Sequence, residues 1–200
     1  SAVVNRPNSF NLRTAARRIQ NFFVNSLKLI NLQRHGTDIH TMVLHLGGDF
    51  ITGYIHRELL ENNSLSPSEA CLRVLERLRA GIAYYLAKGN FKRIVIVCSM
   101  GNHGRTTEKR QISTNYQNSF EWLLYQVLKQ FLTDPRIDFR CEPSYHSYVS
   151  IFGKEYRFHH GDAFKYGGGV GGITIPVLKK IAQWDKTRRA EIDFFGDRKS

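Results

Sequence analysis

Residues 93–105 read RIVIVCSMGNHGR, an apolar run that passes abruptly into a polar stretch. The first half is a continuous series of apolar, mostly β-branched residues, which is typical of a strand buried on both faces of a parallel sheet. The second half places Asn102 and His103 side by side between two glycines. The stretch therefore predicts an α/β fold in which polar side chains lie where a buried strand meets solvent.

Along the chain before and after this strand, sequence patterns typical of helices alternate with patterns typical of strands. Ser66, Pro67 and Glu69 have the spacing of a helix start with a capping box, and Gly89 and Asn90 mark the end of that helix. The expected helices cover residues 11–33, 66–89, 118–132 and 173–186, and the expected strands cover residues 40–48, 93–99, 137–141, 145–153, 155–160 and 191–195. We expect one α/β domain over residues 1–200, with parallel strands in its first half and a later hairpin, turning through Gly153 and Lys154, that makes the sheets mixed.

The chain is strongly basic, because 29 Lys and Arg against 17 Asp and Glu give a formal net charge of +12. Such a surplus favours a polyanionic partner, for which we take nucleic acid, although an acidic membrane surface attracts the same charge. No apolar run approaches the ~18 residues of a membrane span, so we expect no membrane insertion. The three cysteines, Cys71, Cys98 and Cys141, lie far apart, which argues against a disulfide framework and favours a cytoplasmic location.

The first 37 residues contain six Lys or Arg and no acidic residue. An Arg-rich, acid-free start is also found in mitochondrial transit peptides. However, the apolar residues between Leu12 and Ile30 keep helical spacing over about five turns, which favours a packed helix with a basic outer face.

Polar residues of one chemical kind follow three of the predicted strands. The first strand is followed by Gly48-Asp49, the second by Gly101-Asn102-His103, and a later one by His159-His160-Gly161-Asp162. Ligands of open α/β sheets bind at the carboxyl ends of the strands. Each residue alone is explained as a turn or strand-end residue, but together they offer oxygen and nitrogen donors without a thiolate. This set predicts a divalent cation, Mn²⁺ first and Fe or Zn²⁺ otherwise.

The same residues, in this order and at these separations, resemble the middle three motifs of the calcineurin-like metallophosphoesterases. The stretches GGDFITGYIH (47–56) and GNHGR (101–105) are most similar to phage-encoded members, and the nuclease subunit of the double-strand-break repair complex is a more distant relative. The resemblance implies an α/β/β/α sandwich with mixed sheets and a two-metal phosphodiesterase, here a nuclease on DNA in a host cytoplasm. It also implies that Asp49 bridges the metals, that Asn102 and His160 bind the second one, and that His103 acts on the phosphate as general acid.

The sequence departs from this family at both ends. The family begins with Asp-x-His before its first helix and closes with Gly-His-x-His, whereas this chain begins SAVVNRPNSFN and closes with Gly196, Asp197 and Lys199 at the corresponding places. Asp197 can replace a ligand, but a protonated Lys199 has no lone pair to offer. The chain is therefore expected to be truncated at both ends, or else to be a homologue with a decayed site. A complete protein would hold two ions, and this chain at most one, with little activity of its own.

Basic and aromatic side chains near the predicted crevice are candidates for phosphate contact. Arg105 is two residues from His103 and could bind a phosphate with both arms of its guanidinium group. The other candidates are Lys109, Arg110, Lys165 and Tyr166. Two functions stay open at this point: a metal-dependent nuclease, and a non-catalytic module that binds nucleic acid with the same basic surface.

Overall fold

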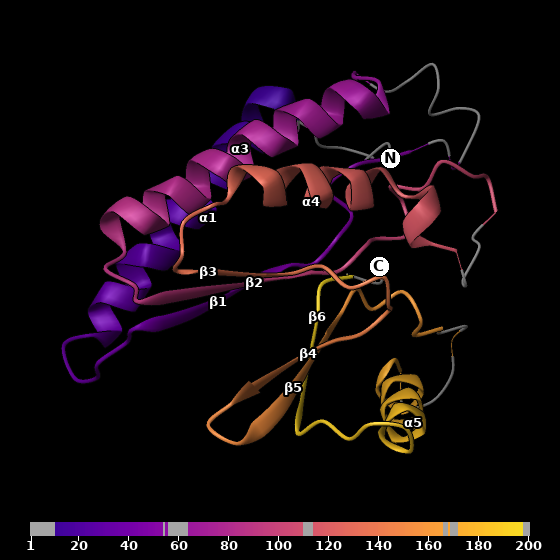
Figure 1. Cartoon of the computed structure of the whole chain (residues 1–200). Helices are drawn as coiled ribbons and strands as arrows, with labels where there is room; N and C mark the ends of the chain where they lie inside the picture. The colour runs from indigo at the N-terminus through magenta and orange to yellow at the C-terminus, as the bar shows by residue number, and fades with distance from the viewer. Residues whose placement is uncertain are drawn as a thin grey trace, which may run out of the picture.

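Helices and strands alternate in the first half of the chain, and strands dominate the second half (Figure 1). The structure, a computed structural model, describes residues 11–53, 55, 64–109, 114–165, 168 and 172–197. The elements are α1 (Leu12–Gln33), β1 (Thr41–Leu46), α3 (Pro67–Lys88), β2 (Arg93–Cys98), η1 (Tyr116–Asn118), α4 (Phe120–Phe131), β3 (Ile137–Arg140), β4 (Ser147–Ile151), β5 (Lys154–His159), α5 (Thr174–Asp185) and β6 (Ile192–Phe195). Every predicted helix and strand is present, with ends that differ by one to a few residues.

Local capping explains where the long helices begin. The Asn11 side chain accepts a hydrogen bond from Thr14 N at 2.9 Å and starts α1. The predicted capping box of α3 is confirmed, since Ser66 Oγ accepts from Glu69 N while the Glu69 carboxylate accepts from Ser66 N. These side chains satisfy N–H groups that have no partner inside the first helical turn.

The strands form two three-stranded sheets, so the fold is mixed α/β as predicted. In the first sheet β1, β2 and β3 are all parallel, with Val43 opposite Val95 and Val95 opposite Asp138. In the second sheet β5 pairs antiparallel with β4 and parallel with β6. The predicted hairpin turn is wrong by one residue, because Lys154 is already paired with Ile151 and the turn consists of Phe152 and Gly153.

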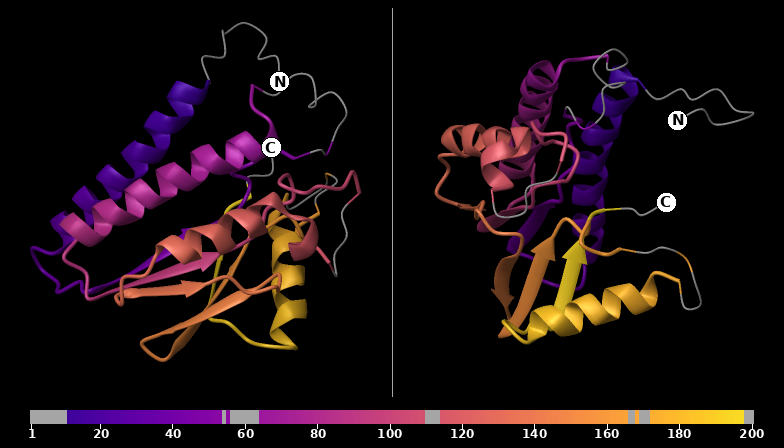
Figure 2. Two further views of the ribbon diagram at one scale, coloured as in Figure 1. Left: turned by 45° about the horizontal axis from the view of Figure 1, so that its top comes forward. Right: turned by 90° about the vertical axis from the view of Figure 1, so that its right-hand side faces the viewer.

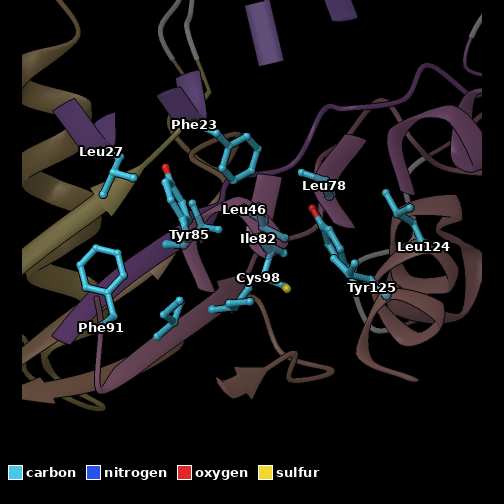
Figure 3. Close-up of a cluster of buried hydrophobic side chains, with 14 of the residues drawn as sticks. Phe23, Leu27, Leu46, Leu78, Ile82, Tyr85, Phe91, Cys98, Leu124 and Tyr125 are labelled. Carbon is cyan, nitrogen blue, oxygen red and sulfur yellow. The ribbon is translucent and has the colours of Figure 1, made fainter. Parts of the chain in front are cut away.

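Three helices cover one face of the first sheet (Figures 1 and 2). Their buried side chains include Phe23 of α1, Ile82 of α3 and Leu124 of α4, which lie in one apolar cluster with Cys98 of β2 (Figure 3). Helices α1 and α3 touch so closely that a Cβ on Gly81 would collide with the Phe23 ring. The basic N-terminal segment thus forms the packed helix that its apolar spacing predicts.

The other face of the first sheet packs against the second sheet. Val95 and Val97 of β2 share a buried cluster with Val149 of β4 and Phe158 of β5. Helix α5 lies on the far side of the second sheet, where Trp184 contacts the Arg157 guanidinium group at 5.2 Å. None of the helices in the described part of the chain has the length and hydropathy for crossing a bilayer.

Phe152, at the tip of the β4–β5 hairpin, is completely exposed and has a φ of 52°. A two-residue turn of this kind needs positive φ at both positions, which suits Asn-Gly and is unfavourable for an aromatic residue. We expect Phe152→Asn to raise the free energy of unfolding by about 0.5–1 kcal/mol, measured by urea denaturation. Phe152→Ala is the control, because it removes the ring and keeps the backbone strain; an equal gain from both variants would contradict this explanation.

His146 lies among aromatic rings between the second sheet and α5, with its ring 4.5 Å from that of Trp184. Burial, followed by the nearby His159 and Arg157, lowers the pKa of His146 from 6.5 to about 4, with Asp193 opposing and Lys180 assisting the shift. Between these pH values the unfolded chain binds a proton that the folded chain does not, so stability falls as the pH is lowered through this window and levels off below it. We expect the thermal midpoint to drop less from pH 7 to pH 5 in His146→Phe than in the wild type; equal drops would refute this.

Candidate metal centre

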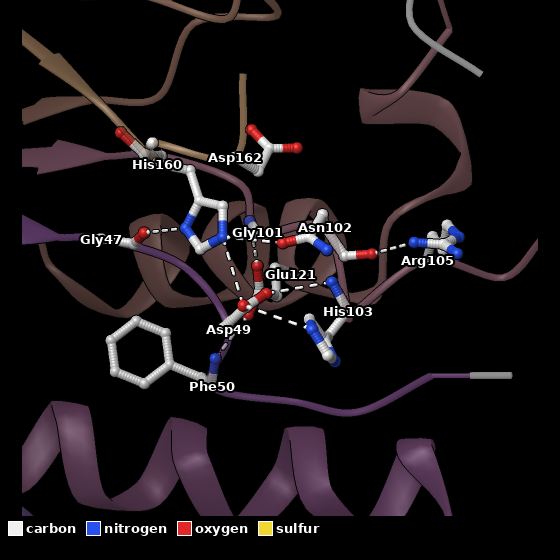
Figure 4. A network of polar contacts seen from close by, with 12 residues as sticks. Gly47, Asp49, Phe50, Gly101, Asn102, His103, Arg105, Glu121, His160 and Asp162 are labelled. Atoms are coloured by element: carbon white, nitrogen blue, oxygen red, sulfur yellow. Dashed lines mark hydrogen bonds and ion pairs between the residues drawn. The ribbon is translucent and has the colours of Figure 1, made fainter. Parts of the chain in front are cut away.

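The ends of β1, β2, β5 and β6 meet at one place, where the two sheets adjoin. Figure 4 shows the residues that follow β1, β2 and β5. Gly47 after β1 lies against Gly196 after β6, since a Cβ on Gly47 would be 3.6 Å from the Gly196 Cα. Asp49, Asn102 and His160 follow three of these strands and converge here, as the strand-end rule predicts. Parallel pairing brings the ends of β1 and β2 to one edge of the first sheet and those of β5 and β6 to one edge of the second, and these two edges adjoin.

The loops after β1 and β2 pack closely against each other at Gly48 and Gly101. Gly48 and Asp49 both have positive φ, 86° and 58°, which turns the chain sharply at the end of the strand. A side chain on Gly48 would collide with Gly101 N, and a side chain on Gly101 would collide with the Asp49 carboxylate and backbone. Glycine at these positions therefore lets the Asp49 carboxylate lie directly over the second loop.

His160 is the centre of the polar network. Its Nδ1 donates to Gly47 O at 2.7 Å, and its Nε2 faces Asp49 Oδ2 at 3.2 Å and Asn102 Oδ1 at 3.0 Å. The side chain is only 2% exposed. A histidine that binds a metal through one nitrogen usually donates its other N–H to a carbonyl or carboxylate, and the contact with Gly47 has this form.

Asp197 adds a further carboxylate from the loop after β6. Ligand atoms of Asp49, His160 and Asp197 all lie within 4.8 Å of one another. The backbone ties this loop to β5, because Gly196 N and Asp197 N both donate to His160 O, at 3.0 and 2.7 Å. With Asn102, the chain thus brings together two carboxylates, one imidazole and one carboxamide, and Lys199 lies outside the described residues.

Opposite charges on Asp49 and His160 stabilise each other at this site. Burial by itself raises the pKa of Asp49, but the hydrogen bonds from His160 and His103 outweigh it, and the pKa of Asp49 is lowered. Burial likewise lowers the pKa of His160, but Asp49 and the Gly47 carbonyl raise that pKa to about 9. Without a cation, an imidazolium proton therefore holds the facing donor atoms together at neutral pH.

His103 and Arg105 lie on the solvent side of the centre. His103 has a side chain that is 47% exposed, with Nε2 at 4.0 Å from Asp49 Oδ2, and its backbone N donates to Asp49 Oδ1 at 3.0 Å. The Arg105 guanidinium group instead donates to the carbonyls of Asn102, Thr107 and Glu108. Arg105 therefore braces its own loop in this structure, and its predicted phosphate contact would require some of these bonds to open.

The remaining candidates for phosphate contact are only partly described. Lys109 is exposed after the GNH loop, whereas Arg110 and Tyr166 lie outside the described residues. Lys165 lines a surface groove of about 480 Å³ together with Lys179 and Lys180 of α5. Three lysine side chains, Lys165, Lys179 and Lys180, thus lie close together on the surface of α5 and the segment after β5.

Two residues that hold the loops of the candidate site were missed by the sequence analysis. Tyr145 holds the loop after β5, since its hydroxyl donates to Asp162 Oδ1 at 2.9 Å and accepts from two backbone N–H groups of that loop. Glu121 is completely buried beneath Asp49 and accepts from Phe50 N and Gly101 N. The one signal for Glu121 is an acid on the otherwise apolar face of a predicted helix.

The donor set fits a divalent cation of the Mn²⁺, Fe or Zn²⁺ type, because every candidate ligand atom is a carboxylate or amide oxygen or an imidazole nitrogen. Comparison of the chain with family models, with curated proteins and with solved structures finds no match.

Proposed function

We propose that this chain is a metal-dependent phosphoesterase that acts on phosphodiesters of nucleic acid, with DNA as its first candidate substrate. The observation that carries the proposal is the convergence of Asp49, His160 and Asp197 within 4.8 Å, with Asn102 beside His160. The order of the GD, GNH and HG motifs at three strand ends supports it. So does the arrangement of helices, two facing sheets and a further helix, which agrees with the α/β/β/α sandwich of the calcineurin-like metallophosphoesterases.

A cation bound here would supply positive charge that stabilises the negative charge developing on a phosphate. Asp49, Asn102 and His160 would hold the cation, and Asp197 would take the place of a family histidine. In the hydrolysis a water molecule would attack phosphorus and lose a proton to solvent, while His103, exposed on the open side of Asp49, would donate a proton to the leaving oxygen. The described residues contain one such cluster, so the chain is proposed to bind a single ion.

Manganese binding tests the proposal directly. We expect the wild-type chain to bind about one equivalent of Mn²⁺ in an electron paramagnetic resonance titration, and Asp49→Asn and His160→Gln to lose most of this affinity. His103→Ala should keep the bound Mn²⁺ and lose the Mn²⁺-dependent cleavage of DNA, however weak that cleavage is. The control is His35→Ala, which changes an exposed histidine after α1. Unchanged Mn²⁺ binding in both ligand variants would refute the assignment.

The net charge of +12 favours one alternative, a non-catalytic module that binds nucleic acid. The two functions differ in their dependence on the cation. Binding of a DNA duplex that persists in EDTA, with no cleavage at any Mn²⁺ concentration, would support the module. Cleavage that requires Mn²⁺ and His103 would support the enzyme.

A further inference from the structure

A single carboxylate joins the two loops that carry Asp49 and Asn102. Phe50 directly follows Asp49, and Gly101 directly precedes Asn102. Both backbone N–H groups donate to Glu121, one to each oxygen, and both distances are 2.6 Å. Glu121 comes from a third element, the first turn of α4, so it connects two strand ends without being part of either.

The position of Glu121 is unfavourable for a side chain that serves only the fold. The residue is 0% exposed, and burying a carboxylate is costly unless its oxygens are well paired. Burial raises the pKa of Glu121 to about 7, although the hydrogen bond from Gly101 opposes the shift. The positive end of the α4 dipole partly offsets the cost of burial. An apolar residue would fill the same space without a buried charge.

The GNH loop is built around this carboxylate. A Cβ on Gly104 would be 2.9 Å from Glu121 Cγ and 3.2 Å from its Cδ, so glycine leaves the room that the glutamate occupies. The loop is also fastened to the start of α4, because Phe120 N donates to Gly104 O and Thr106 N donates to Asn118 O, both at 2.8 Å. The Glu121 carboxylate is therefore held in place by its own helix, α4, and by the GNH loop that packs against it.

We propose that Glu121 is a positioning residue that fixes the separation of the Asp49 and Asn102 loops and thereby sets the cation affinity of the centre. This inference rests on the proposed function, since it concerns the same cation. Glu121 acts only through the backbone of Phe50 and Gly101. A glutamine at this place has one carbonyl oxygen for two N–H donors, so one of the two loops loses its tether.

The test compares Glu121→Gln with Glu69→Gln. Glu69 also accepts a backbone N–H at a helix start, but it lies in the capping box of α3, away from the centre. We expect Glu121→Gln to weaken Mn²⁺ binding about 10- to 100-fold at a temperature where the variant is fully folded, as is typical when support of metal ligands is lost. Glu69→Gln should change the thermal midpoint only. A wild-type Mn²⁺ affinity in folded Glu121→Gln would overturn the inference.

Two further measurements separate this inference from the proposed function. Gly104→Ala keeps the carboxylate and displaces it, so it should weaken Mn²⁺ binding in the same way, even if Glu121→Gln fails to fold. At pH 8, above the pKa of Glu121, the amide resonances of Phe50 and Gly101 should move strongly upfield in folded Glu121→Gln, because their hydrogen bonds to a charged acceptor are weakened or lost. If the wild type binds no Mn²⁺, the proposed function fails; if the amide resonances also stay unchanged, the tether itself is refuted.

Discussion

Replacing Arg157 with alanine is expected to lower the free energy of unfolding by about 3–5 kcal/mol. The Arg157 side chain is 0% exposed, and its guanidinium group contacts Asp193 at 2.6 and 3.0 Å and Asp185 at 3.0 Å. Burial by itself lowers the pKa of Arg157, but the hydrogen bonds with Asp193 and its other partners raise it overall. Removal of the cation leaves the Asp193 carboxylate buried, 3.5 Å from His159, without its main partner.

Urea denaturation of Arg157→Ala and Arg93→Ala gives the measurement and its control. Arg93 also pairs with an aspartate, Asp138, but its side chain is more than half exposed. Exposed ion pairs contribute about 0–1 kcal/mol, so the control variant should be almost as stable as the wild type. Similar losses from the two variants would mean that burial of the Arg157 pair has no special importance.

The second large effect is expected at the candidate metal centre, in Gly101→Ala. The added methyl group would collide with the Asp49 carboxylate and with its backbone N, neither of which can move while Gly48 packs against Gly101 N. We expect the affinity for Mn²⁺ to fall about 10- to 100-fold. Overpacking of this kind is also expected to lower the free energy of unfolding by about 1–3 kcal/mol.

Gly36→Ala is the matched control for this substitution. Gly36 has no atoms within 4 Å of an added Cβ and no positive φ, so the variant should keep both its stability and its Mn²⁺ affinity. Calorimetric titration with Mn²⁺ and thermal unfolding of both variants check the result. An unchanged affinity in Gly101→Ala would show that the Asp49 carboxylate is not held where the geometry puts it.

Much of the fold could be predicted because its signals are local. The Ser66 capping box and the apolar run of β2 each depend on a few adjacent residues, and the structure confirms both. The predicted hairpin turn was wrong by one residue because its position depends on the pairing of two strands and not on a local signal. Sequence preference disfavours an aromatic residue at positive φ, yet the β4–β5 register, with Ile151 opposite Lys154, forces Phe152 into the turn.

In the candidate site, too, the residues with a local sequence signal could be predicted and the others could not. The convergence of Asp49, Asn102 and His160 could be predicted because each follows a strand. Parallel pairing of β1 with β2 brings the first two together, whereas His160 reaches them from the second sheet. The roles of Arg105 and Glu121 depend on which backbone carbonyls and N–H groups lie near them, and those groups come from loops whose path no short pattern encodes. Whether these residues bind a cation remains the prediction that the Mn²⁺ titration tests.

The pairing of β6 with β5 has a consequence for stability. It brings Asp197 next to His160, so the donors at residues 49 and 197 meet although they lie far apart along the chain. A cation that binds the folded arrangement and not the unfolded chain would therefore raise the free energy of unfolding of the whole polypeptide.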